Sequence, residues 1–211
     1  MTISYPLSLP TTLLPDGIDW HMETVVGSLE SPFSLVQQNY VWPGSERWRA
    51  TLTWGGQMSQ VNADDIEVFL LALNGMEGSF LLGDHLRTTP RGTWAGQSPL
   101  VKGASQTGKT LLIDGLTPTT TTAIKGDWFQ LGSGATSRLH RLTATGTANG
   151  SGEITLDFEP SIRTSPSDNA PLTIASPKGL FMRAGNVTGW SQQGGLDSGI
   201  TFDCVEDKRG L

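Results

Sequence analysis

Phosphate binding is the first chemistry that the sequence suggests, because Gly103 to Thr110 reads GASQTGKT. Two glycines with four residues between them, then Lys and Thr, match the loop that cradles nucleotide phosphates, in which Lys109 would contact the phosphates. That chemistry needs a strand before the loop and a helix after it. Residues 111–115 read LLIDG and Pro118 follows, which predicts a strand and a turn. We therefore favour a β-hairpin loop here over a nucleotide-binding enzyme that uses Lys109.

Acid–base and metal chemistry have less support in the sequence. The histidines His21, His85 and His140 lie far apart, and none has the two-histidine spacing of a zinc site. Asp84 beside His85 could form half of an acid–base pair, but no GxSxG turn or reactive-cysteine context accompanies it. We expect a solvent-facing or hydrogen-bonded loop histidine. We predict that the chain is not an enzyme and has no catalytic residue, no metal site and no cofactor.

Two groups of carboxylates are further candidates for acid–base chemistry. Asp157 and Glu159 flank a phenylalanine on a predicted strand, so they share a face about 7 Å apart. That separation would suit a glycosidase pair. Two acids on the wet face of a strand are common, and we favour that interpretation. Asp64, Asp65 and Glu67 fall in the first turns of a predicted helix, where their simplest role is to favour the helix dipole.

Aromatic side chains are the more informative group, since exposed ones stack on sugars or fill subunit interfaces. Trp48 and Trp54 alternate with polar residues and are predicted to lie in the core. Trp94, in a glycine-rich loop, is the best candidate for contact with a partner, although core packing or anchoring of the loop remains open. The tryptophans are Trp20, Trp42, Trp48, Trp54, Trp94, Trp128 and Trp190.

Composition favours a β-rich protein without nucleic-acid or membrane partners. The 211 residues include 26 Gly and 12 Pro, which supply the backbone angles that many tight turns require. The net charge is −6 and no run of three basic residues occurs, which disfavours specific binding to nucleic acid. Cys204 is the only cysteine, so no intrachain disulfide can form. The N-terminal residues lack the pattern of a signal peptide, and no apolar run approaches the roughly 20 residues that span a bilayer.

Alternation of apolar and polar residues predicts one clear strand and one helix in the first part. In Arg47 to Trp54 every second residue is apolar, which predicts a half-buried strand that ends at Gly55-Gly56. Val61 to Gly75 is predicted as a helix with Asn62 as its cap and Asn74-Gly75 as its stop signal. Its apolar face is Ile66, Phe69, Leu70 and Leu73. Residues 1–19 are predicted to be an extended arm.

Short β-type segments recur through the remainder of the chain. Thr88 to Ser98 is predicted to be a loop and a candidate boundary. Strands spaced by about ten residues after it indicate a small barrel or sandwich. Cys204 shares a strand face with Ile200 and Phe202 and is predicted to be a small core residue. The predicted strands are 79–82, 110–113, 128–131, 138–144, 153–158, 179–183 and 198–205.

Several segments together resemble the distal tail proteins of long-tailed bacteriophages, and the resemblance spans most of the chain from Trp20 onward. It is a similarity in the overall pattern of residues rather than a match to an invariant motif. The segments are SPFSLVQQNYVWPGSERWRATLTW (31–54), GSFLLGD (78–84), KGDWFQLGSG (125–134), GSGEITLDFEPSIRTSPSDNAPLTI (150–174), SPKGLFMRAGN (176–186) and GITFDCVED (199–207).

The resemblance implies a mainly β fold: a β-sandwich with one α-helix, plus an inserted small β-barrel domain. The sandwich would comprise residues 1–98 and 175–211, and the barrel residues 99–174. It also implies a homo-oligomeric, hexameric ring in the virion tail, which joins the tail tube protein to the tail hub and receptor-binding apparatus. A carbohydrate-binding β-module, or adhesin, is the alternative. The inserted segment leaves little room for an additional lectin-like module, which weighs against sugar binding.

Overall fold

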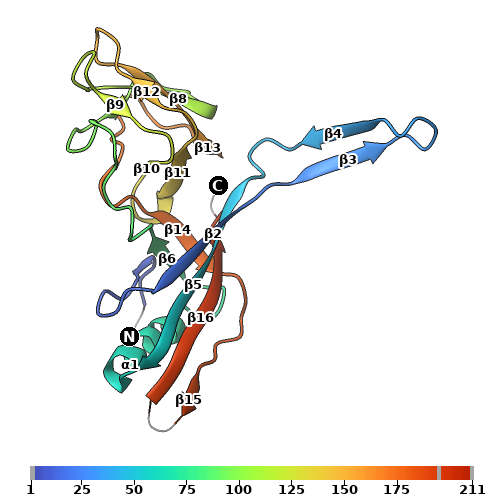
Figure 1. Ribbon diagram of the computed structural model, residues 1–211, viewed down its shortest axis with the longest axis vertical. Helices are drawn as coiled ribbons and strands as arrows, with labels where there is room; N and C mark the ends of the chain where they lie inside the picture. Colours follow the sequence, from blue (N-terminus) through green and yellow to red (C-terminus); the bar gives the residue numbers. More distant parts are fainter. Residues whose placement is uncertain (1–2, 194–195, 210–211) are drawn as a thin grey trace.

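The computed structural model describes residues 3–193 and 196–209 and shows a mainly β protein with one α-helix (Figure 1). Strands account for 41% of the chain and helices for 8%, which confirms the predicted fold class. Within the described helices none is long and apolar enough to cross a membrane.

The larger sheet is built from both ends of the chain. Its strand order is β1-β6-β14-β16-β5-β2, and β15 pairs with β16. All neighbours are antiparallel except β1 and β6, which are parallel. The strands are β1 (Leu7–Ser8), β2 (Gly17–Glu23), β5 (Arg47–Met58), β6 (Ser79–Leu82), β14 (Gly179–Arg183), β15 (Ser191–Gln193) and β16 (Leu196–Glu206).

The middle of the chain forms a second antiparallel sheet with the order β10-β11-β13-β8-β7, and β9 and β12 make a separate pair. One 3-10 turn, η1 (Gly134–Thr136), precedes β11. The strands are β7 (Leu100–Val101), β8 (Gly108–Asp114), β9 (Thr122–Ala123), β10 (Trp128–Leu131), β11 (Arg138–Leu142), β12 (Gly146–Thr147) and β13 (Ile154–Ile162). The predicted strands of this region all form, although β11 ends two residues early and β13 runs four residues further.

Strand β5 is longer than its alternating pattern predicted. Trp48, Ala50, Leu52 and Trp54 are buried on one face, as expected. The glycine pair after Trp54 was predicted to end the strand, and this is wrong: pairing with β16 continues to Met58. The register shifts at the glycines because β5 contains one extra residue there, with Gly56 at a φ of 77°. Glycine adopts this backbone conformation without a steric cost, so the pair forms a β-bulge.

The helix α1 (Gln60–Ala72) packs its predicted apolar face on the sheet, with Ile66, Leu70 and Leu73 fully buried. Its start differs from the prediction. Ser59 is the N-cap residue and makes no side-chain capping bond, so Asn62 lies inside the first turn. Because the helix begins earlier, no acidic residue falls in its first turn. Asp64 and Asp65 therefore do not occupy the dipole-favouring position that we predicted.

The end of the helix follows the sequence. Asn74 and Gly75 both adopt positive φ angles, 49° and 67°, and the Gly78 amide donates to the Leu73 carbonyl at 2.8 Å. A left-handed residue followed by a returning amide bond satisfies the last carbonyls of a helix. The Asn74-Gly75 stop signal is therefore confirmed.

The N-terminal segment is part of the body rather than a separate arm. Leu7 and Ser8 pair with β6, and β2 already begins at Gly17. The Leu13 carbonyl accepts a hydrogen bond from Trp54 Nε1 at 3.0 Å. Tyr5 Oη donates to the Ala72 carbonyl, at the end of α1, at 2.7 Å. The prediction of an arm missed these contacts because they join residues far apart in sequence.

Two clusters of buried apolar residues fill the molecule. The first lies between the larger sheet and α1 and also includes Trp128 and Leu139 from the middle of the chain. The second lies within the middle sheets and includes Trp94, Phe129 and Phe158. The two clusters meet along β10 and β11, whose side chains alternate between them.

Buried charged groups lie at the junction of two halves of the molecule, the larger sheet with α1 and the middle sheets. The Arg163 guanidinium contacts the Glu206 carboxylate and the Glu46 carbonyl oxygen, and both acids are at most 2% exposed. Ser161 Oγ donates to Glu46 Oε2 at 3.0 Å. Burial by itself raises the pKa of Glu46, but hydrogen bonds from its own backbone, Lys109 and Ser161 lower it overall. Glu46 is thus held as a carboxylate inside the junction.

We expect Tyr5→Phe to lower the free energy of unfolding by about 1 kcal/mol, since the substitution removes one partly buried neutral hydrogen bond to the end of α1. Urea denaturation followed by circular dichroism measures this. Tyr40→Phe, at an exposed position, is the matched control and should change stability by less than about 0.5 kcal/mol. Equal stability of the two variants would show that the N-terminal segment does not support the helix.

Candidate functional site

The phosphate-loop motif lies in a β-hairpin connection, as we favoured. Residues 102–107 join β7 to β8, and the residues after the motif continue as strand β8 rather than as a helix. Lys109 Nζ lies 2.7 Å from Glu159 Oε1 and 3.1 Å from Glu46 Oε1. The hydrogen bond to Glu159 is the main cause that raises the pKa of Lys109. Lys109 therefore helps to hold the junction between the two halves.

The other predicted polar candidates are dispersed. Asp157 is exposed on β13, and Glu159 on the same strand pairs with Lys109. His21 is exposed on β2, His85 lies in the loop after β6, and His140 is buried in β11. In the described part of the chain no group of three or more His, Cys, Asp or Glu side chains could hold a metal ion.

Cys204 and His140 both serve the core. Cys204 is 1% exposed, its Sγ donates to the Ala50 carbonyl at 3.2 Å, and burial raises its pKa. The prediction of a small core residue is confirmed. His140 stacks on Phe129 and meets Phe158 edge-on, and its Nδ1 lies 2.9 Å from the Pro160 carbonyl oxygen. Burial lowers the pKa of His140 to about 4, although the bond to Pro160 opposes this.

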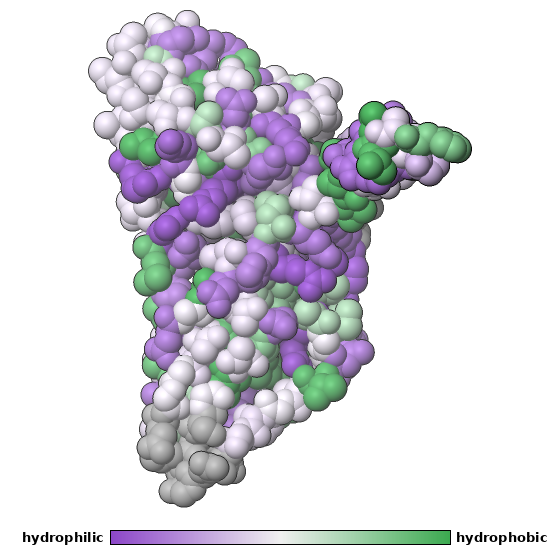
Figure 2. Space-filling view, turned by 45° about the vertical axis from the view of Figure 1, so that its right-hand side comes forward, coloured by the Kyte–Doolittle hydropathy of each residue, from purple (hydrophilic) through white to green (hydrophobic). Residues whose placement is uncertain are grey.

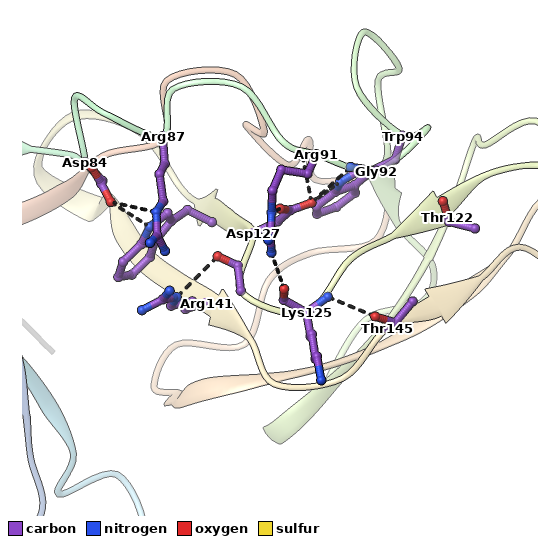
Figure 3. Close-up of polar contacts among 12 residues, drawn as sticks. Asp84, Arg87, Arg91, Gly92, Trp94, Thr122, Lys125, Asp127, Arg141 and Thr145 are labelled. Atoms are coloured by element: carbon purple, nitrogen blue, oxygen red, sulfur yellow. Dashed lines mark hydrogen bonds and ion pairs between the residues drawn. The ribbon is translucent and has the colours of Figure 1, made fainter.

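Trp94 is buried, so of the two uses left open for this residue, contact with a partner is wrong and the core or loop-anchoring use is confirmed. Its side chain is 0% exposed in the second buried cluster. Trp94 Nε1 donates to Asp127 Oδ2 at 3.1 Å, and the backbone amides of Arg91 and Gly92 donate to the same oxygen. Asp127 therefore holds the glycine-rich loop against the body by these hydrogen bonds (Figure 3). Among the tryptophans, Trp42 and Trp190 are the exposed ones.

A projecting hairpin is the most exposed apolar element of the described chain, and sequence reasoning missed it. Strands β3 (Val26–Glu30) and β4 (Gln37–Val41) pair only with each other and form a two-stranded sheet. They extend the β2–β5 ribbon away from the body (Figure 1). At its base, Lys208 Nζ donates to the Gly44 and Ser45 carbonyls, both at 3.1 Å. We call residues 24–45 the β3–β4 hairpin.

Apolar side chains cover the β3–β4 hairpin on both faces and at its tip. Phe33 is 98% exposed and Leu35 is 71% exposed. Glu30 is the only charged residue between positions 24 and 45. Figure 2 shows the hairpin standing clear of the body, with hydrophobic residues at its base and toward its tip. The large apolar residues exposed by about half or more are Val25, Val26, Leu29, Phe33, Leu35, Val36, Tyr40, Val41 and Trp42.

The tip of the hairpin holds its leucine in a costly conformation. Leu35 has a φ of 55°, in the left-handed region, which costs a non-glycine residue roughly 1–2 kcal/mol. The turn is closed by bonds from the Leu35 amide to the Ser31 carbonyl at 2.9 Å and from the Ser31 amide to the Val36 carbonyl at 3.0 Å. Glycine would fit this position without strain. The structure thus places an exposed leucine where glycine would be the least strained residue.

A cleft lined by arginines lies on the body, beside the loop that Asp127 anchors. Arg87 and Arg91 come from the loop after β6, and Arg141 comes from β11 (Figure 3). The Arg141 guanidinium lies over the Trp128 ring, 5.0 Å from its centroid, and its Nε donates to the Gly126 carbonyl at 3.2 Å. We call this region the arginine cleft.

The sequence matches no protein-family model, and no curated protein matches it.

We expect Trp94→Ala to cost about 3–5 kcal/mol of stability, because it leaves a large cavity and removes one hydrogen bond to Asp127. Chemical denaturation measures the change. Trp42→Ala, which removes an exposed indole, is the control and should leave the stability of the monomer within about 0.5 kcal/mol. A small effect of Trp94→Ala would contradict the anchoring role of the indole.

We expect His140 to make the fold sensitive to mild acid. Its folded pKa of about 4 lies below the unfolded value of 6.5, so its contribution is complete above pH 6.5 and is lost as the pH falls toward 4. The unfolded state takes up the proton first, and the loss amounts to about 3 kcal/mol. Urea unfolding at several pH values between these limits measures it. His140→Gln should flatten this dependence, whereas His21→Gln should preserve it. A dependence unchanged in His140→Gln would assign the effect to other groups.

Proposed function

We propose that the protein is a structural component of a bacteriophage tail tip. In this role copies of the chain form a hexameric ring that joins the tail tube to the hub and the receptor-binding apparatus. The proposal follows the resemblance to distal tail proteins, which includes residues 31–54. That segment contains the tip of the β3–β4 hairpin, strand β4 and the first part of β5, up to Trp54.

The observation that best supports an assembly role is the exposed apolar surface of the β3–β4 hairpin. Its exposed apolar side chains present on the order of 1,000 Å². Stable interfaces bury about 800 Å² on each partner, and monomers rarely leave larger apolar patches in water. An isolated two-stranded hairpin is also only marginally stable. The two faces and the tip of the hairpin together therefore expose enough apolar surface to pack against a neighbouring protein.

A second copy of this chain is the partner that the surface favours. The outward face of α1 also exposes apolar side chains, Val61, Val68 and Leu71, at helical spacing, with Asp64 and Asp65 between them. In Figure 1, α1 lies low in the body, and the hairpin projects from its side, away from α1. A contact between two different surfaces of one chain is head-to-tail, and such contacts produce a ring when the rotation closes.

The low charge of the hairpin is compatible with contact between two copies of the chain. The chain has a net charge of −6, so an acidic arm would be repelled by a neighbouring copy. The β3–β4 hairpin has one carboxylate, Glu30, which accepts a hydrogen bond from Gln37 Nε2 at 2.7 Å. Strand β2, at the outer edge of the larger sheet, leads directly into the hairpin. Its unpaired backbone groups supply a further surface next to the same contact.

The proposal predicts a mass about six times 22.6 kDa in light scattering, and ring-shaped particles in negative stain. The variant Phe33→Ser with Leu35→Gly should be monomeric. Glycine suits the left-handed backbone at position 35, so the hairpin keeps its shape while its tip loses the apolar contact.

Leu86→Ser is the matched control, because Leu86 is 77% exposed and lies outside the hairpin. It should assemble as the unmodified chain does. A chain that stays monomeric at roughly 100 µM, a concentration well above that of typical stable complexes, would contradict the proposal. A ring that survives the double substitution would show that the hairpin is not the contact.

A further inference from the structure

The arginine cleft has more positive than negative charge within a chain that is acidic overall. Three guanidinium groups, those of Arg87, Arg91 and Arg141, face two carboxylates, Asp84 and Asp127. The side chains of Arg87 and Arg91 are 56% and 62% exposed, whereas both carboxylates are largely buried. The basic groups are thus the accessible ones.

The two carboxylates are already occupied by other donors. Asp127 Oδ1 accepts from Arg91 Nε at 3.2 Å, and its other oxygen accepts from the anchored loop and Trp94. Asp84 Oδ2 accepts from Trp128 Nε1 at 3.3 Å and is 3.9 Å from Arg87 Nε, a long ion pair. Among the ion pairs of the described residues, none includes Arg141. Burial lowers the pKa of Arg141, and the nearby charges of Arg87 and Arg91 lower it further, although Asp84 opposes this.

Two adjoining cavities provide space for a ligand beside these groups. One, of about 320 Å³, is lined by Arg87, Arg91 and Asp127. The other, of about 190 Å³, is lined by Arg87, Arg141 and His85. Arg87 and Leu86 border both. The pair is large enough for a small polyatomic anion and open enough for the end of a side chain.

Gly126 marks the point at which two guanidinium groups converge. A methyl group on Gly126 would lie 3.0 Å from Arg91 Nη2 and 3.7 Å from Arg141 Nη2. The space beside this glycine is therefore bordered by nitrogen donors of two different arginines. Arg91 Nη2 also contacts the Lys125 carbonyl oxygen, and Arg141 Nε donates to the Gly126 carbonyl. Both guanidinium groups are thus held beside this turn, and their remaining N–H groups can donate to the oxygens of a carboxylate or phosphate group.

We infer that the arginine cleft is a binding site for an oxyanion, either a phosphate-like ion or the carboxylates of an acidic peptide segment. Arg91 contributes N–H donors from the cavity beside Gly126, Arg141 contributes them from the adjoining cavity, and Arg87 borders both. This site is separate from the β3–β4 hairpin, and its presence does not depend on ring formation.

Isothermal titration calorimetry of the intact chain at low salt tests the inference, with inorganic phosphate in one arm and a tri-glutamate peptide in the other. We expect saturable binding in at least one arm. Tighter binding of phosphate identifies a free oxyanion as the ligand, and tighter binding of the peptide identifies an acidic protein segment. Absence of saturable binding in both arms would overturn the inference.

Arg87→Gln and Arg141→Gln should each weaken binding at least about tenfold, the effect of losing one charge-assisted contact. Arg87 is exposed, so its substitution leaves the fold intact even where Arg141→Gln disturbs the stacking on Trp128. Arg49→Gln makes the same change in net charge outside the cleft and should alter the affinity less than about twofold. Equal losses in all three variants would mean that overall charge, not the cleft, attracts the anion, and would also overturn the inference.

Discussion

The pairing of β5 with β16 is the interaction on which the rest of the structure depends. It joins segments about 150 residues apart and places Leu52 opposite Phe202 and Ala50 opposite Cys204 on one buried face. The other strands of the larger sheet add to this pair on either side, and α1 packs on its apolar face. The hairpin is an outward continuation of β5 and its other neighbour, β2. Both the core and the projecting surface therefore begin from one strand.

Buried charges give the two halves a fixed relation to each other. Arg163 contacts Glu206 and the backbone of Glu46, and Lys109 pairs with Glu46 from the exposed side. Removing one partner from such a group leaves a buried charge without compensation, which costs several kcal/mol. The lysine of the phosphate-loop motif thus has a structural use, and a match of residue types alone does not identify a phosphate site.

The two surface features differ in chemistry and suit different ligands. The β3–β4 hairpin is nearly uncharged and apolar, so its binding energy would come from removing surface from water. The arginine cleft is polar, with guanidinium groups that favour oxygen ligands at fixed geometry. In the roles that we propose, the hairpin would pack against a large apolar surface, and the cleft would hold a compact oxyanion group. Each can therefore be altered without changing the other.

Local pattern alone was sufficient for the mainly β class, the buried faces of residues 47–54 and 200–204, and the end of α1 at Asn74-Gly75. These features depend on the spacing of apolar residues along the backbone and on the backbone conformations that each residue permits. Both are properties of the local sequence. Tertiary structure decided the rest. Trp94 is buried where its indole N–H donates a hydrogen bond to Asp127, distant in sequence, and the arginine cleft unites a loop with a strand about 50 residues later. The exposed hairpin has apolar residues like those of a core strand, because a sequence pattern shows which side chains share a face but not whether another part of the chain covers it.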